Sequence, residues 1–202
     1  PKNALVFAVI LEVVAFAVLW AGANFLSAIL ALSATAFYVF IYSLWLKRTS
    51  KQNIVIGGAA GAMPTLIGWA AVTNSVGWPA VWLFIIMFLW TPPHFWALAI
   101  RHADEYRAAN VPMLPVVVSI ERTVRTMFCY TVVLAAATLV LMPVANLGWI
   151  YGGTAIVLGL GFSVGTAMLG RKPTEAWSMK VFSFSITYVT VLFGALMVDV
   201  LV

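Results

Sequence analysis

Two acidic residues and a tyrosine follow one another directly after a long apolar run: Asp104, Glu105 and Tyr106. Two cations, Arg101 and Arg107, lie within one helical turn of the acids. Hard Mg²⁺ binds in proteins through one or two carboxylates, with phosphate oxygens and water as its other ligands. These residue types at this spacing therefore indicate a magnesium site that acts on a phosphate-bearing substrate.

An ordinary solvated helix end would carry the same residues. Arg101 with Glu105, and Asp104 with Arg107, have the spacing of ion pairs along one helix, and each such pair contributes only about 0.2–0.5 kcal/mol. The acidic segment alone leaves these two explanations open.

A basic segment supports the magnesium hypothesis. Lys47 and Arg48 follow a different apolar run, with Asn53 close behind as a hydrogen-bond donor. A positively charged cytoplasmic loop would look the same. Cations opposite a magnesium-bearing segment are nevertheless what a diphosphate requires, because it accumulates negative charge as its carbon–oxygen bond breaks. We expect Lys47 and Arg48 to bind a diphosphate, and Arg122 and Arg125 are further candidates.

The two histidines, His94 and His102, are considered separately. An unbroken helix would place them about 12 Å apart along its axis, so they cannot share a metal ion without a bend. His94 has apolar neighbours and is either a buried, hydrogen-bonded histidine or a contact to a substrate, and the sequence leaves both open. His102, at the membrane interface, is expected to be a polar anchor.

Long apolar helices must position these residues. The 202-residue chain is 64% hydrophobic and 8% charged, with a mean hydropathy of +1.06, which is typical of a polytopic membrane protein. A helix needs roughly 20 apolar residues to cross the hydrocarbon core. We identify seven runs of this kind, at 4–21, 25–46, 54–73, 80–100, 126–145, 149–169 and 181–202. Because the runs are apolar on every side, we expect an all-α bundle that forms one domain over residues 1–202, and no β-barrel.

Glycine and proline residues indicate how the helices pack. Gly57 and Gly61 lie one turn apart, and we expect them to allow close helix contact rather than to touch a ligand. Pro92 and Pro93 precede His94 directly, and we expect this pair to break its helix and open a cavity.

The distribution of charge predicts the orientation in the membrane. Basic residues are retained on the cytoplasmic side. All eleven Lys and Arg residues fall on one side of the predicted bundle, in the first two residues and in the loops at 47–53, 101–125 and 170–180. No charge occurs in the opposite loops, around 22–24, 74–79 and 146–148. The net charge of +5 therefore reflects topology and a lipid bilayer as partner, and nucleic acid is not expected.

Two segments resemble a known family. They read LKRTSKQNIVIGGAAGAMPTLIGW from Leu46 and WTPPHFWALAIRHADEYRAANVPMLPVV from Trp90. Both are similar to the protoheme IX farnesyltransferases, or heme O synthases, among the UbiA-type intramembrane prenyltransferases. The likeness is dense over residues 44–118, and it implies that the seven helices belong to a nine-helix bundle.

The resemblance implies a Mg²⁺-dependent enzyme. It would transfer a farnesyl group from farnesyl diphosphate to a vinyl group of heme B, giving heme O for heme A biosynthesis. It would lie in the bacterial plasma (inner) membrane with its active site on the cytoplasmic face, or in the mitochondrial inner membrane of a eukaryote. Downstream partners would be a heme A synthase or a terminal oxidase assembly.

The resemblance also implies roles for the acidic segment. Asp104, Glu105 and Tyr106 occupy the family's second acidic motif and would be catalytic, with Asp104 and Glu105 holding Mg²⁺. The family usually has Asp directly before the tyrosine, where this chain has Glu105.

Substrate contacts follow from the same resemblance. Lys47 and Arg48 would contact the diphosphate, with Asn53 in support. His94 falls on the heme side. The other substrate-binding residues implied are Arg101 and His102.

One family feature does not match. Family members have nine transmembrane helices and a first aspartate-rich motif after the second, and nothing in residues 1–21 resembles that motif. We therefore expect the chain to be the C-terminal part of a longer enzyme, without two helices and that motif. By itself it is expected to be inactive.

Two other functions stay open. A UbiA-type prenyltransferase for an aromatic quinone precursor would share the diphosphate site, but normally with a more aspartate-rich second motif. A secondary transporter would more often carry ionisable groups near the midplane, whereas here they gather at one face. A retinal protein is excluded, because residues 181–202 contain no lysine for a Schiff base.

Overall fold

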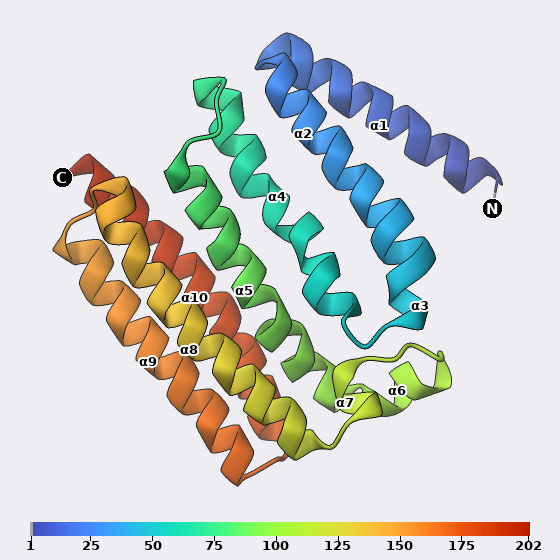
Figure 1. Ribbon diagram of the computed structural model, residues 1–202, viewed down its shortest axis with the longest axis vertical. Helices are drawn as coiled ribbons and strands as arrows, with labels where there is room; N and C mark the ends of the chain where they lie inside the picture. The colour runs from blue at the N-terminus through green and yellow to red at the C-terminus, as the bar shows by residue number, and fades with distance from the viewer. Residues whose placement is uncertain (1) are drawn as a thin grey trace.

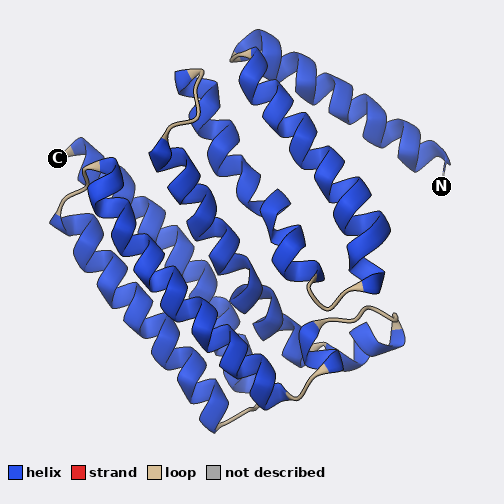
Figure 2. Cartoon of the chain, viewed as in Figure 1, coloured by secondary structure: helices blue, strands red, loops and turns tan. Residues whose placement is uncertain are grey.

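The computed structural model describes residues 2–202, and over this range the chain is helical and contains no strand (Figure 2). Seven helical spans are long and apolar enough to cross a membrane. They are α1 (Lys2–Gly22), the unbroken run of α2 (Phe25–Ala36), η1 (Phe37–Leu46) and α3 (Lys47–Thr49), α4 (Asn53–Thr73), α5 (Trp78–Arg101), α8 (Ile120–Ala145), α9 (Trp149–Arg171) and α10 (Glu175–Leu201). The predicted all-α fold with seven spans is confirmed.

The expected loop at 101–125 is largely helical. It contains α6 (Ala103–Ala108) and α7 (Leu114–Val117), and α8 begins at Ile120 instead of near residue 126. The side chain of Ser119 caps α8 by accepting a hydrogen bond from the Arg122 backbone at 3.3 Å. A cap of this kind starts the helix in the polar interface, where hydropathy alone does not detect it. Arg122 and Arg125 therefore belong to the first turns of α8.

Helix α5 is central to the packing, because it contacts α4 on one side and α8 and α10 on the other (Figure 1). The main apolar core lies among α5, α8, α9 and α10, and its largest buried side chains include Trp96, Phe162 and Tyr188. Helix α1 packs against α2 but buries none of its residues, and Figure 1 shows it leaning away from the bundle.

Helix α5 runs without interruption through Pro92 and Pro93, so the predicted break is wrong. Both prolines are buried where α5 meets its neighbouring helices. Proline is tolerated inside membrane helices because neighbouring helices and side chains satisfy the backbone groups that it leaves unbonded. The proline pair is therefore part of the packed core.

The carboxylate of Asp199, near the end of α10, bonds to the start of α9. The two carboxylate oxygens of Asp199 accept hydrogen bonds from the backbone N–H groups of Gly148 and Tyr151, the latter at 3.1 Å. These N–H groups open α9 and have no partner within that helix. Asp199 thus caps α9 from the end of α10, in a place where a negative charge also favours the helix dipole.

Helices α8 and α9 approach each other at a glycine. A Cβ added to Gly159 would lie 2.7 Å from the Cβ of Ala135 on α8, whereas one added to Gly153 on the same helix would meet nothing within 4 Å. Gly159 therefore permits a contact that no larger residue fits.

We predict that Gly159→Ala lowers the free energy of unfolding by about 1–3 kcal/mol, as overpacked cores do. Gly153→Ala is the matched control and should be neutral or slightly stabilising, because alanine favours helix more than glycine does. Equilibrium unfolding in mixed micelles, followed by circular dichroism, measures both. Equal stability of the two variants would contradict the close contact of α8 with α9.

Candidate active site

The acidic and basic segments lie at the same end of the bundle. Figure 1 shows α3, which carries Lys47 and Arg48, at the end where α6 and α7 connect α5 to α8. Helix α5 stops at Arg101 because His102 leaves the helical conformation, with φ −100° and ψ 24°. Asp104 and Glu105 then form the first turn of α6.

The two acids are exposed and each has a charged or polar neighbour. The side chain of Asp104 is 95% exposed and pairs with Arg107, as the solvated-helix explanation predicts. Glu105 is 78% exposed and lies 3.0 Å from Nδ1 of His102. The expected pair of Glu105 with Arg101 is not present among the described residues, because the interruption at His102 puts the two side chains on different helices.

Tyr106 attaches this acidic turn to the rest of the bundle. Its half-buried ring packs against an apolar cluster of Ile54, Ala99, Val111 and Met113. Ile54 belongs to the first turn of α4 and Ala99 to the last turns of α5. The cluster therefore fixes the acidic segment beside the start of α4, which directly follows the basic segment.

The buried side chain of Asn53 bonds to the backbone of the basic segment. Lys47 and Arg48 are exposed, whereas Asn53 is fully buried and its Nδ2 donates a 3.4 Å hydrogen bond to the carbonyl oxygen of Lys47. The Oδ1 atom of Asn53 is enclosed and has no partner among the described residues. Asn53 thus orients the backbone that carries the two cations.

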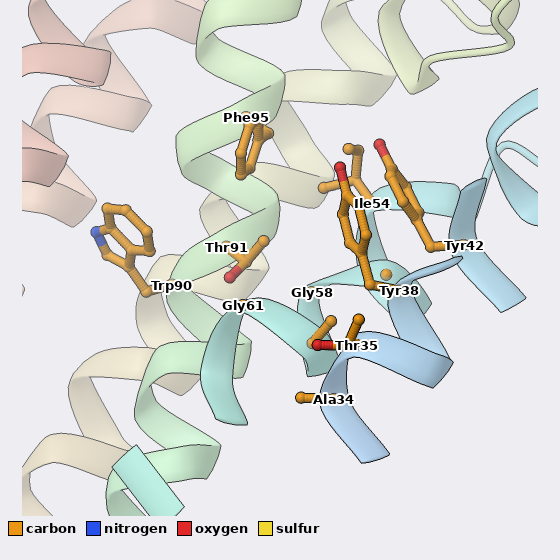
Figure 3. A pocket seen from close by; sticks show the side chains of 12 residues that line it. Ala34, Thr35, Tyr38, Tyr42, Ile54, Gly58, Gly61, Trp90, Thr91 and Phe95 are labelled. Atoms are coloured by element: carbon orange, nitrogen blue, oxygen red, sulfur yellow. The ribbon is translucent and has the colours of Figure 1, made fainter. Parts of the chain in front are cut away.

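An apolar pocket opens next to this ionic end. It has a volume of about 480 Å³ and lies among α2, η1, α4 and α5 (Figure 3). Tyr38 and Tyr42 form one wall with their ring centroids 5.3 Å apart, and Figure 3 shows both hydroxyls pointing the same way, toward the side on which Ile54 lies. Ile54 both lines the pocket and packs against Tyr106, so the pocket ends beside the acidic segment.

The pocket depends on a rare helix form. Residues 37–46 are a π-helix, and the N–H of Lys47 bonds to the carbonyl of Tyr42, five residues back. π-helical segments are rare and are frequently found at functional sites. Sequence reasoning missed Tyr38 and Tyr42, because hydropathy does not distinguish a π-helix from an α-helix.

The glycines beside these tyrosines have different roles. A Cβ added to Gly57 would overlap the ring of Tyr42, whereas one added to Gly61 would meet nothing within 4 Å. Both residues line the pocket. The expected close helix contact is therefore confirmed for Gly57 and is wrong for Gly61, which borders open space.

The remaining candidates lie elsewhere. His94 is on α5 but does not line the pocket; its Nδ1 lies 2.6 Å from Oγ of Ser185 on α10. Arg122 and Arg125 line a separate depression on α8 with Cys129. The structure thus places the acidic and basic segments at the same end of the bundle, beside the pocket but not lining it, and it leaves His94 and these arginines elsewhere.

The donor set at the acidic turn fits a partial magnesium site. Within residues 2–202 no group of three or more His, Cys, Asp and Glu side chains could hold a metal ion. Asp104 and Glu105 offer two exposed carboxylates, and Mg²⁺ commonly takes one or two, with phosphate oxygens and water. Asp104 and Glu105 would bind the ion directly, and phosphate oxygens and water would complete its coordination.

Comparison with known proteins agrees with this geometry. Residues 1–196 match the model of the UbiA prenyltransferase family. The chain belongs to this family. It is 54% identical over 98% of its length to the protoheme IX farnesyltransferase of Gloeobacter violaceus, and 49% identical over 97% to that of Parafrankia sp.. It covers 66% and 64% of those two proteins, so the chain spans about two thirds of the length of the curated relatives it matches.

A solved structure supports the fold. The chain superimposes with a TM-score of 0.81 on a structure from work on digeranylgeranylglyceryl phosphate synthase in membranes, covering 98% of this chain and 69% of that one. The two sequences are 18% identical, so the likeness concerns the fold alone. It confirms the UbiA-type arrangement of helices.

We predict that Gly57→Ala displaces the ring of Tyr42 and reduces prenyl transfer by the full-length gene product about tenfold or more, a loss of about 1.4 kcal/mol or more in transition-state stabilisation. Gly61→Ala adds the same methyl group to the same pocket without a clash and should stay within about twofold of the parent. Turnover with radiolabelled prenyl diphosphate measures both. Equal activities would show that the position of Tyr42 is unimportant.

Proposed function

We propose that the protein to which this chain belongs transfers a farnesyl group from farnesyl diphosphate to a vinyl group of heme B, giving heme O, and that this chain supplies the site for the diphosphate and the isoprenoid chain. The support for this acceptor is the identity of about half of the residues to proteins named protoheme IX farnesyltransferase. The observation that carries the proposal is an apolar, aromatic pocket that ends beside the acidic and basic segments at one end of the bundle.

The two parts of farnesyl diphosphate match the two parts of this site. The isoprenoid chain would occupy the apolar pocket, whose volume of about 480 Å³ lies in the usual range for small-molecule sites. The diphosphate would lie at the ionic end, between the exposed cations Lys47 and Arg48 and the acids of α6. We place this end on the cytoplasmic side of a bacterial plasma membrane, because the basic residues gather there.

The reaction begins when the bond between the allylic carbon and the diphosphate oxygen breaks. Lys47 and Arg48 stabilise the negative charge that develops on the leaving group. Mg²⁺ held by Asp104 and Glu105 would neutralise the same charge as a Lewis acid. To bind the ion, both carboxylates must turn from Arg107 and His102, a small change because the side chains are exposed.

The positive charge left on the allylic chain faces an aromatic wall. The rings of Tyr38 and Tyr42 line the pocket, and aromatic faces attract cations. The heme vinyl group supplies the electron pair for the new carbon–carbon bond. Water then adds to the resulting cation and loses a proton, so diphosphate and one proton leave as the hydroxyethylfarnesyl group forms.

We predict that Asp104→Asn and Glu105→Gln each lower turnover of farnesyl diphosphate with heme B by about a hundredfold or more, as loss of a group that stabilises transition-state charge does. Chelation of Mg²⁺ should abolish the reaction. Lys47→Gln should produce a similar loss by removing a cation from the leaving group.

The matched controls are Glu121→Gln and Lys172→Gln, which remove exposed charges outside the site and should leave turnover near that of the parent. The assay quantifies heme O by liquid chromatography in full-length gene product, with 4-hydroxybenzoate as a competing acceptor. Prenylation of 4-hydroxybenzoate instead of heme would contradict the acceptor, whereas unchanged turnover without Mg²⁺ would contradict the metal.

A further inference from the structure

Helices α5 and α10 hold the ring of His94 between two aromatic side chains. The ring of Trp90 stacks on it at a centroid distance of 4.2 Å and an interplanar angle of 20°, and that of Phe182 stacks at 4.6 Å and 27°. Rings on both faces prevent the imidazole from tilting, so the directions of its two nitrogen atoms are set by the fold.

A hydrogen-bond chain fixes which nitrogen carries the proton. Oγ of the fully buried Ser185 lies 2.5 Å from the carbonyl oxygen of Phe182 and 2.6 Å from Nδ1 of His94. Two oxygen atoms this close must share a hydrogen, and a serine hydroxyl has only one. Ser185 therefore donates to Phe182 and accepts from His94, so Nδ1 carries the ring proton and Nε2 presents a free lone pair.

The backbone of Ser185 is tied to α5 as well. Nε1 of Trp90 donates a 2.8 Å hydrogen bond to the carbonyl oxygen of Ser185. Trp90 thus both stacks on His94 and holds the residue that orients it. This arrangement specifies the position of the imidazole to a degree that simple core packing does not require.

The Nε2 atom of His94 has no hydrogen-bond partner among the described residues 2–202. It is also not fully enclosed by these residues. An acceptor that faces hydrocarbon without a partner costs free energy. A histidine that donates one N–H to an oxygen and leaves the other nitrogen free has the arrangement typical of a metal ligand.

We propose that Nε2 of His94 is an axial ligand of the iron in the tetrapyrrole substrate, and that Ser185 is the positioning residue for it. This inference rests on the proposed function, in which heme B is the acceptor.

The test is spectroscopic and independent of turnover. Full-length gene product in nanodiscs is titrated with ferric and ferrous heme B, and its absorption and electron paramagnetic resonance spectra are recorded. The parent should show a nitrogen-ligated iron. His94→Ala should lose that signature, and added imidazole should restore it, which also shows that the variant is folded.

The positioning role has its own variants. Ser185→Ala removes the acceptor and should weaken heme binding about tenfold or more, the usual cost of losing a partner behind a metal ligand. Ser185→Thr keeps the hydroxyl and should restore binding. His102→Ala, at the other histidine of this chain, should keep the nitrogen-ligated signature of bound heme whatever its effect on affinity or turnover.

The outcomes separate the two proposals. A nitrogen-ligated spectrum that persists in His94→Ala overturns the assignment of the iron ligand and leaves the farnesyl transfer proposal standing. Equal affinity of Ser185→Ala and the parent overturns the positioning role. Absence of any heme binding by the parent overturns the acceptor in the proposed function, and the inference with it.

Discussion

The absence of water in the bilayer core is the constraint on which the rest of this structure depends. Every backbone N–H and C=O group in hydrocarbon must be bonded within the chain, so the spans are helices. Polar side chains inside them bond to their own helix, as Thr138 does to Ala135 and Thr166 to Phe162, at 2.8 and 2.9 Å. Ionisable groups are mostly confined to one end, and that end is where a charged leaving group can be bound.

The pocket satisfies the opposite requirement, since an isoprenoid chain needs an apolar cavity near those charges. Its location follows from three local features: the π-helix brings Tyr38 and Tyr42 to one wall, Gly57 lets the ring of Tyr42 reach α4, and Ile54 connects the cavity to Tyr106. Each feature is small. Together they put an aromatic surface directly beside the segment that would release the diphosphate.

The sequence predicts the membrane fold well, because each span is an independent apolar run, and hydropathy measures that property directly. It also identifies the ionic segments, because charges are rare in this chain. It does not predict that α5 continues through Pro92 and Pro93, because whether proline interrupts a membrane helix depends on the helices packed around it. Nor does it predict the contact of His94 with Ser185, which lie 91 residues apart and are joined only by the packing of α5 on α10.

Trp90 connects the two halves of the proposed chemistry. It lines the apolar pocket, and its ring also stacks on His94. A farnesyl chain in the pocket and a porphyrin on His94 would therefore approach from different sides of the same residue on α5. Because the allylic carbon that loses the diphosphate also forms the new carbon–carbon bond, the heme vinyl group would have to reach that carbon at the end of the pocket beside the ionic segments. The apolar lining of the pocket would keep bulk water from the allylic cation until the new bond has formed, after which one water molecule has to enter to complete the addition.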